Sequence, residues 1–343
     1  MPPLSDLTIR PFQSASDYSL MHNIISLSDQ ADRVSEPFSL EDIIQWCSPS
    51  IRFDPAKDLL FALLQNPSCE ETVVGFGRLS WYTGLGGIRL YNQVSYLHPN
   101  WRQPGIWRAM VRQNEQRLKE MAAGHQIDAL RFFQGWATSS QVMWISVLES
   151  QGYQAVRHFN NMLYRLDEVP HRPMPAGLEI RPVQPEQFRL IWEAHREVVL
   201  SLFEVVAENW VDEKYESWQK NPSHTPELWQ VAWDGDQVAG MVLNRIDQAL
   251  NQQLDRKRGY TEHIFVWQAW RNRGLAGALL AKSLQVLKAQ GMQEAELGVD
   301  TENESGAYGF YQHVGYQTFS TDTWFRKPML TPAPPNHSVR LGL

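Results

Sequence analysis

The chain has 343 residues, of which 43% are hydrophobic and 20% charged, a composition typical of a soluble globular protein. A chain of this length is too long for one ordinary hydrophobic core, which predicts two domains of about 150 residues each. The net charge of −7 is spread over both halves without a basic run or tail, which argues against nucleic acid as a partner.

The cysteines and the apolar runs indicate which cellular compartment the protein is expected to occupy. Cys47 and Cys69 are the only cysteines and form no C-x-x-C pair, so neither a disulfide framework nor a zinc site is expected and both read as buried free thiols. No apolar run approaches about 18 residues, so no membrane span is expected. The first residues lack a charged segment followed by an apolar run, and we expect a cytoplasmic protein with no bound metal.

Three segments recur in the same order in the two halves. Leu7–Pro11 reappears as Leu178–Pro182, Leu97–Gly105 matches Val266–Gly274, and Leu148–Tyr153 matches Tyr311–Tyr316. The offsets are 171, 169 and 163 residues, and chance similarity does not account for three ordered matches with nearly constant spacing. The sequence therefore predicts a duplicated domain.

Hydrophobic periodicity gives each copy the same series of elements. In the first copy it predicts strands at 7–11, 59–64, 72–80 and 128–133, and helices at 16–28, 38–48 and 105–123. In the second copy it predicts strands at 178–182, 229–233, 237–244 and 294–299, and helical segments within 185–220 and at 275–290. A short helix, a Gly-Tyr turn and closing strands complete each copy.

This alternation predicts a mixed α/β fold in each copy. We expect an N-terminal domain at 1–168 and a C-terminal domain at 177–330. A proline-rich linker at 169–176 separates them, because its prolines disfavour a helix or a central strand. The tail at 331–343 is also rich in proline and is expected to be loose.

The most informative stretch runs from Glu262 to Gly277. It begins as an apolar strand, continues through a basic turn with glycine, and opens an amphipathic helix. The first N–H groups of a helix lack internal partners and carry the positive end of its dipole. Gly274 and Gly277 allow close approach to this backbone, and Arg271 and Arg273 add positive charge. The geometry predicts a site for a pyrophosphate.

The turn does not match the two best-known phosphate loops. No G-x-x-x-x-G-K-[ST] motif occurs, and Gly274–Gly277 does not fit the G-x-G-x-x-G fingerprint. Arg271–Ala276 instead has the form R/Q-x-x-G-x-G/A, which resembles the coenzyme A loop of the GNAT superfamily of N-acetyltransferases. Over nearly the whole chain the order of elements resembles a tandem GNAT protein, although the specific motifs lie within 262–316.

The resemblance implies two domains, each with a central, mostly antiparallel twisted sheet flanked by helices, and acetyl-CoA as acyl donor. It implies coenzyme contacts from the strand end, the turn, the first helical turn and two later positions. These residues are Phe265, Val266, Arg271, Asn272, Arg273, Gly274, Leu275, Ala276, Gly277, Asn303 and Tyr308. Asn303 matches the residue that binds the pantetheine arm, but a plain helix N-cap is an equally good interpretation.

Acetyl transfer from a thioester to an amine requires a proton acceptor and a proton donor. By resemblance, Glu262 removes a proton from the amine; the alternative is a solvated carboxylate paired with Lys257 or Arg258. His263 is a poorer candidate, since strand alternation sends it to the opposite face. Tyr311, in an A-x-x-x-Y-x-x-x-G-Y segment, resembles the tyrosine that protonates the departing thiolate; the alternative is a packing aromatic residue.

The first copy departs from this pattern at the functional positions. By alignment it has Gln93 in place of Glu262 and Leu148 in place of Tyr311, and neither serves as base or acid. Pro104 removes an N–H donor from its turn, and Trp107 stands where a small residue keeps the backbone accessible. We expect this copy to be degenerate and non-catalytic.

The sequence thus predicts an N-acetyltransferase with its active site in the C-terminal copy and a small-molecule or peptide amine as acceptor. Alternatives are a non-catalytic coenzyme A-binding or interaction module, or acyl transfer to another acceptor. Aromatic and acidic residues within Trp192–Trp218 would suit a cationic amine, although an amphipathic helix with solvated acids explains them as well. The sequence does not indicate an oligomeric state.

Overall fold

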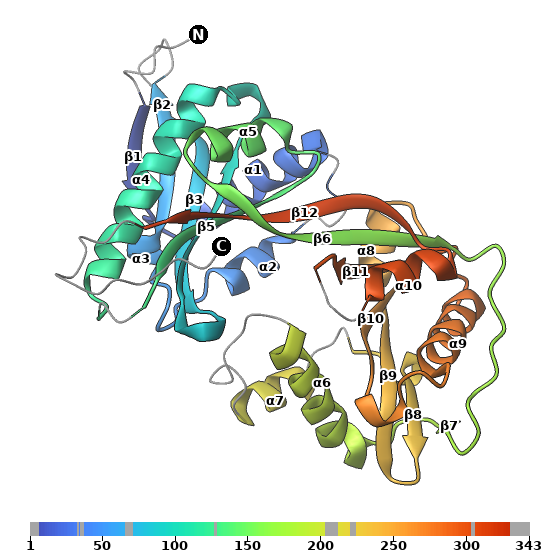
Figure 1. The fold of residues 1–343 in the computed structure, drawn as a ribbon. Helices are drawn as coiled ribbons and strands as arrows, with labels where there is room; N and C mark the ends of the chain where they lie inside the picture. The colour runs from blue at the N-terminus through green and yellow to red at the C-terminus, as the bar shows by residue number, and fades with distance from the viewer. Residues whose placement is uncertain are drawn as a thin grey trace. The chain divides into compact units, whose positions relative to one another are not determined.

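A computed structural model of the chain describes residues 7–32, 34, 38–65, 71–126, 129–202, 212–219, 224–302 and 306–329. The chain divides into two compact units (Figure 1). Unit 1 contains Met1–Val156 and Thr323–Leu343, and unit 2 contains Arg157–Asp322. Each unit is a sheet with helices on its two faces.

In unit 1 the sheet order is β1-β2-β3-β4-β5, followed by the end of β12. Neighbouring strands are antiparallel except β4 and β5, which run parallel. The strands are β1 (Leu7–Pro11), β2 (Leu59–Gln65), β3 (Glu71–Thr83), β4 (Arg89–Leu97) and β5 (Arg131–Thr138). The helices are α1 (Ser16–Asp32), α2 (Leu40–Trp46), α3 (Pro55–Asp58), α4 (Pro104–Ala123) and α5 (Val142–Ser150).

Alternation along β2 divides the core of unit 1 into two layers. Phe61 and Leu63 pack with α1 and α2 on one face, whereas Ala62 and Leu64 pack with α4 and α5 on the other. All four side chains are at most 5% exposed, so this strand is buried on both faces. This burial explains why β2 is a continuous apolar run.

In unit 2 the order is β12-β6-β11-β10-β9-β8-β7, and only β10 and β11 among the pairs with a described register are parallel. The strands are β6 (Gln154–Arg165), β7 (Glu179–Ile180), β8 (Gln230–Asp234), β9 (Gln237–Ile246), β10 (Arg258–Val266), β11 (Glu294–Asp300) and β12 (Gln317–Pro328). The helices are α6 (Phe188–Leu202), α7 (Asp212–Gln219), α8 (Gln248–Gln253), α9 (Leu275–Ala289) and α10 (Ala307–Val314).

The closing strands of the two sequence copies are exchanged between the units. β6 ends the first copy, yet from Arg157 on it belongs to unit 2 and pairs with β11 from Phe159↔Asp300 to Arg165↔Glu294. β12 ends the second copy, yet Phe325 packs in the core of unit 1. The compact units therefore divide the chain at 156/157 and 322/323, while the repeated segments follow the order of the sequence.

The predicted mixed α/β class is confirmed, but some helices and strands of the second copy differ from the prediction. The first predicted strand of the second copy shrinks to the two residues of β7. The helical region within 185–220 contains α6 and α7 as separate helices. Helix α8 was not expected; Asp247 caps it by accepting a hydrogen bond from the Leu250 N–H at 2.9 Å.

The duplication is visible in one glycine of each copy. A Cβ atom at Gly75 would lie 2.7 Å from the Tyr96 carbonyl oxygen, and one at Gly240 would lie 2.7 Å from that of Phe265. The next neighbours also correspond, because Leu97 and Met110 surround Gly75 as Val266 and Leu279 surround Gly240. Both copies thus require a glycine, without a side chain, where β3 or β9 pairs with the strand that leads to the turn.

Gly240→Ala is expected to destabilise unit 2 by about 1–3 kcal/mol, because the new methyl group meets main-chain atoms that have no room to move. The measurement is the midpoint of urea unfolding followed by tryptophan fluorescence. Gly298→Ala on β11 is the control, since its nearest neighbour would be the Asn161 side chain at 3.7 Å. Equal midpoints for the two variants would contradict the steric argument.

Candidate active site

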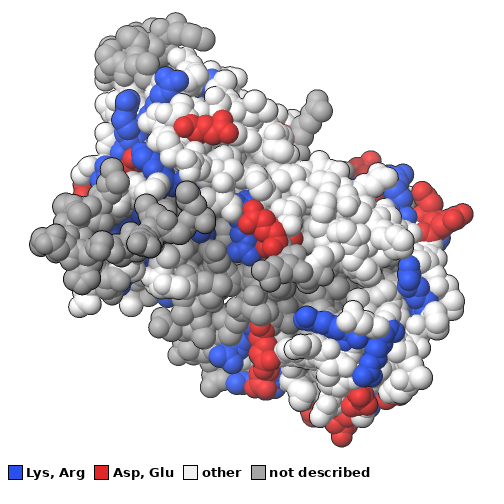
Figure 2. All heavy atoms as spheres, in the orientation of Figure 1, with Lys and Arg blue, Asp and Glu red and all other residues white. Residues whose placement is uncertain are grey.

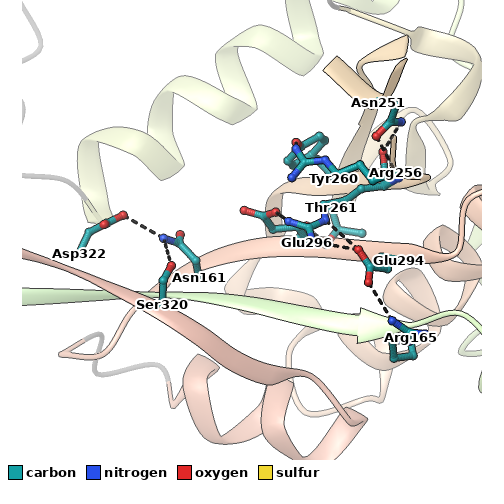
Figure 3. A network of polar contacts seen from close by, with 11 residues as sticks. Asn161, Arg165, Asn251, Arg256, Tyr260, Thr261, Glu294, Glu296, Ser320 and Asp322 are labelled. Carbon is teal, nitrogen blue, oxygen red and sulfur yellow. Dashed lines mark hydrogen bonds and ion pairs between the residues drawn. The ribbon is translucent and has the colours of Figure 1, made fainter. Parts of the chain in front are cut away.

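The site is organised by a parallel strand pair that hydrogen-bonds only at its beginning. β10 pairs with β11 from Arg258↔Glu294 to Tyr260↔Glu296, and then each strand continues with its other neighbour. Arg258 fixes the paired end by binding Glu294 at 2.9 Å and Glu296 at 2.7 Å (Figure 3). All three side chains are less than 20% exposed. Beyond Tyr260 the carboxyl ends of both strands are free to contribute side chains to a site.

A β-bulge in β10 changes the direction of side chains just after the paired end. Glu262 lies opposite Leu243 and Phe265 opposite Met241, so β10 has one extra residue between these positions. His263 adopts a left-handed backbone conformation with φ of 50°. The expectation that simple alternation sends His263 to the opposite face is wrong, because the bulge interrupts alternation at that residue.

Glu262 is held by an arginine on the adjacent strand. The Nε and Nη2 atoms of Arg245 on β9 both donate to Glu262 Oε1 at 3.2 Å, so Arg245 leaves Oε2 uncontacted. The Glu262 side chain is 37% exposed. The sequence alternatives for its partner, Lys257 or Arg258, are not what the structure shows, since Arg258 pairs with Glu294 and Glu296.

Two histidines lie beside the bulge, and a third interacts with both. The rings of His195 on α6 and His263 are 3.8 Å apart. Burial, together with the neighbouring His263 and His224, lowers the pKa of His195 to about 3. Crowding by protein atoms also lowers the pKa of His263, although its side chain keeps contact with solvent and the Glu262 carboxylate opposes the shift. Sequence reasoning missed His195 and His224, which carry no motif.

The basic turn has the backbone shape that an anion site requires. Asn272 and Gly274 have φ angles of 60° and 83°, and Gly274 is the N-cap of α9. A Cβ atom at Gly274 would meet nothing within 4 Å, so space is open above the helix end. The Nε atom of Arg271 donates to the Val266 carbonyl oxygen at 2.9 Å, which ties the turn to the end of β10.

The other predicted coenzyme residues divide into core and surface positions. Phe265, Val266 and Leu275 are at most 9% exposed and pack with the sheet, so only their main-chain atoms face the turn. Gly277 is buried, Ala276 is half-buried, and Arg273 is exposed. None of the hydrogen bonds found among the described residues occupies the N–H groups of Leu275, Ala276 or Gly277.

Tyr311 lies in α10, which follows β11, and is 7% exposed. Its ring is 6.1 Å from that of Tyr316, whose hydroxyl is 3.1 Å from the Thr261 hydroxyl on β10. Burial raises the pKa of Tyr311 above its ordinary value, so the hydroxyl keeps its proton at neutral pH. Tyr308 is half-buried and accepts a hydrogen bond from Gln312. Asn303 lies outside the described residues.

In the first copy the corresponding turn has a different backbone shape. Pro104 starts α4 one residue before Gly105, the counterpart of Gly274, and Gly105 is not among the residues with positive φ. Arg102, the counterpart of Arg271, also donates to the strand end, at the Leu97 carbonyl, but its terminal nitrogens pair with the buried Asp32. The guanidinium of Arg102 is therefore already paired with a carboxylate of the same chain.

A cavity of about 230 Å³ remains in unit 1, beside the end of β4 and the start of α5. Its lining includes Arg102 and Asp32, together with Trp107 and Trp144, whose rings are 4.6 Å apart. Leu148 is fully buried, as its counterpart Tyr311 nearly is. Two indole rings and a neutralised ion pair thus form part of the cavity wall.

The structure corrects one sequence correspondence between the copies. β4 pairs with β3 without a bulge, and Gln93 lies opposite Leu79. Counting from the glycines that the copies share, the residue of β10 in that place is Thr261, one position before Glu262. The hydrogen bonds agree, because Gln93 donates to Tyr153 at 2.6 Å and Thr261 contacts Tyr316. The extra residue of the bulge is what a direct alignment of the two copies overlooks.

The aromatic residues expected around the acceptor are partly occupied by the chain itself. The guanidinium carbon of Arg189 lies 5.0 Å from the ring centre of Trp192 and 4.8 Å from that of Tyr215. Trp218 packs against His224 at 4.6 Å. Cation–π contacts at Trp192 and Tyr215 are therefore already made, while residues 203–211, including Glu204, Glu208 and Trp210, lie outside the described residues.

Other expectations concern charge, thiols and metals. On the face drawn in Figure 2, blue and red side chains of the described residues are interspersed. Cys47 is buried with a free thiol, whereas Cys69 lies outside the described residues. Within the ranges that the structure describes, no cluster of three potential metal ligands occurs, and no helix is long and apolar enough to cross a membrane.

A splayed parallel pair, a bulged strand and a glycine-capped helix together define the α/β fold of unit 2. The model of the Acetyltransferase (GNAT) family matches residues 187–316. Solved structures share the fold: a GCN5-related N-acetyltransferase from Sphaerobacter thermophilus superimposes with a TM-score of 0.69 at 22% identity, covering 96% of both chains. A tandem GNAT protein from the clavulanic acid biosynthesis pathway gives 0.63 at 15% identity, covering 94% of this chain and 98% of that one.

Curated relatives point to the same family. N-alpha-acetyltransferase 30 of Schizosaccharomyces pombe is 34% identical over 91 residues, which are 26% of this chain and 58% of the yeast protein. An acetyltransferase of Yersinia pestis is 26% identical over 147 residues, which are 42% of this chain and 91% of that protein. The family model thus indicates a GNAT acetyltransferase domain at residues 187–316, within the second sequence copy, and the chain spans 58% of the length of the yeast relative.

The histidine pair predicts a loss of stability in acid. The unfolded chain binds a proton on His195 near its ordinary pKa of about 6.5, but the folded chain resists protonation down to about pH 3. Between these values stability falls with decreasing pH, by at most about 1.4 kcal/mol per unit. His195→Phe is expected to flatten this part of the profile in urea unfolding at pH 4.5–7.5. His171→Gln in the linker is the control, and an unchanged slope for His195→Phe would refute the assignment.

Proposed function

We propose that the chain transfers an acetyl group from acetyl-CoA to a primary amine of a small molecule or peptide. The active site is the C-terminal copy, at the separated ends of β10 and β11. The observation that carries this proposal is the glycine-capped start of α9, with uncontacted N–H groups and two arginines directly after the bulged strand. The first copy is non-catalytic in this proposal.

The residues of the second copy suit the coenzyme. An extended diphosphate needs main-chain donors at a helix start and positive charge beside them. Gly274 provides open space, and Arg271 is fixed through Nε, which leaves its terminal nitrogens for a ligand. No carboxylate among the described residues pairs with Arg271 or Arg273, in contrast to Arg102 and Asp32 in the first copy. A cytoplasmic location is part of the same proposal.

Direct transfer needs no covalent enzyme intermediate. The amine nitrogen forms a bond with the acetyl carbon, the carbon–sulfur bond breaks, and the amine loses one proton while the thiolate gains one. In this proposal Glu262 accepts the amine proton through Oε2, since both hydrogen bonds from Arg245 end at Oε1. Tyr311 carries a hydroxyl proton that it retains at neutral pH, and its helix follows the strand opposite Glu262.

In this proposal the bulge also acts on the acetyl group. A bulge leaves its extra residue outside the ladder, so the bulge between Glu262 and Phe265 offers a main-chain N–H as a fixed donor in this proposal. Developing negative charge on the acetyl oxygen is stabilised by such fixed donors, commonly by about 3–4 kcal/mol for each one. The strain of a non-glycine residue at positive φ, of the order of 1–3 kcal/mol, is consistent with a functional position.

Tyr311→Phe is expected to lower turnover by about 10²–10⁴-fold, because the thiolate then leaves without a positioned proton donor. Turnover is measured by release of the free thiol across a panel of amines, and acetyl-CoA affinity by calorimetry. Affinity should change little, since the ring remains. Tyr164→Phe, which removes an exposed hydrogen bond to the Glu168 carbonyl, is the control.

Two results would overturn the proposal. If the chain binds acetyl-CoA but no amine in the panel stimulates thiol release, and Glu262→Gln changes nothing, the chain is a binding module. If Tyr311→Phe retains full turnover on an accepted amine, Tyr311 is a packing residue and the proton comes from elsewhere. Faster turnover with a longer acyl-CoA than with acetyl-CoA would show that the transferred group is a longer acyl group.

A further inference from the structure

The proline-rich linker is fastened along helix α9. Lys288 near the end of this helix donates to the Asp167 carbonyl oxygen at 2.6 Å, and Gln285 donates to that of Pro170 at 3.1 Å. Later linker residues thus meet earlier helix residues, so the linker runs antiparallel to α9 toward its N-terminus. Met174 then packs in the apolar cluster that contains Leu275. The segment between Pro170 and Met174 is therefore held at both ends.

Arg172 lies within this held segment and reaches the first turn of α9. A Cβ atom built on Gly277, the third residue of the helix, would lie 3.0 Å from Arg172 Cδ, 3.5 Å from Nε and 3.7 Å from Cζ. Gln285 and Gly277 are eight residues apart, or about 12 Å along the axis. Two extended linker residues cover about 7 Å of this distance. The arginine side chain covers the rest and points toward the helix start.

The position of this guanidinium is electrostatically unfavourable without an anion. The N-terminus of a helix carries partial positive charge, and a cation beside it costs free energy that an anion would recover. Arg172 is exposed, and no hydrogen bond or ion pair joins it to another residue within the described ranges. Arg271 and Arg273 bring two further guanidinium groups to the adjoining turn. A side chain at position 277 would occupy the space that Arg172 uses.

We propose that Arg172 is a third arginine ligand of the coenzyme diphosphate, supplied by the linker rather than by the turn. This inference rests on the proposed function, because it concerns the same site. Its chemistry is the pairing of a planar guanidinium with phosphate oxygens. The linker thereby has a binding role in addition to joining the two sequence copies.

The test is calorimetric titration of the full chain with acetyl-CoA, CoA and dephospho-CoA. Arg172→Ala is expected to weaken all three about tenfold, the change that 1.4 kcal/mol produces. Its affinity should also depend less on salt than that of the wild type, since one charge contact is gone. Arg112→Ala removes an exposed arginine of α4 in unit 1, and His171→Ala changes the neighbouring linker residue; both should bind like the wild type.

Gly277→Ala provides an independent check of the contact. Its methyl group must displace Arg172, so it should weaken binding in the wild-type background and have no further effect in Arg172→Ala. Additive losses would show that the methyl group acts on the coenzyme directly and would overturn the assignment.

The outcomes separate this inference from the proposed function. A wild-type chain that binds none of the three ligands refutes both. Wild-type binding with unchanged affinity in Arg172→Ala refutes the inference alone. A loss confined to acetyl-CoA and CoA, with dephospho-CoA unaffected, would assign Arg172 to the 3′-phosphate and overturn the diphosphate assignment.

Discussion

The parallel pairing of β10 with β11 ends after three residues, and the arrangement of the site depends on that limit. Arg258, Glu294 and Glu296 hold the paired end closed, and Figure 3 shows this network beside Thr261. If the parallel pairing continued, the main-chain N–H groups of the two strands would be used in hydrogen bonds between strands. None of them would then remain as donors for a ligand. Because pairing stops, the bulge at His263, the start of α9 and the helix with Tyr311 can all contribute to one region.

The two copies keep the same backbone constraints and differ in chemistry. Both place a glycine against the strand that leads to the turn, and both use an arginine Nε to tie that turn to the strand end. In the first copy Pro104 begins the helix early, Asp32 takes the guanidinium of Arg102, and no bulge interrupts β4. The residues that the two copies share therefore serve the fold, whereas the proposed anion site needs residues that only the second copy has. The exchanged closing strands give each unit a core that needs the other copy's chain.

Much of this organisation follows from the sequence because it depends on local signals. Hydrophobic periodicity predicted helices α4 and α9 and strands β8 and β9. The bulge could not be predicted, since it depends on register between strands and no residue type marks it. The partner of Glu262 was missed for a similar reason: Arg245 comes close only through strand pairing. The position of Arg172 depends on how the linker packs along α9, which the prolines alone do not specify.

The central claim is that only the second copy presents main-chain N–H groups and unneutralised arginines to a diphosphate. Calorimetric titration of acetyl-CoA into Arg271→Ala and Arg102→Ala chains tests it most directly. We predict one coenzyme per wild-type chain, affinity at least tenfold weaker in Arg271→Ala, and wild-type affinity in Arg102→Ala. Two coenzymes per chain, or a loss of binding confined to Arg102→Ala, would contradict it.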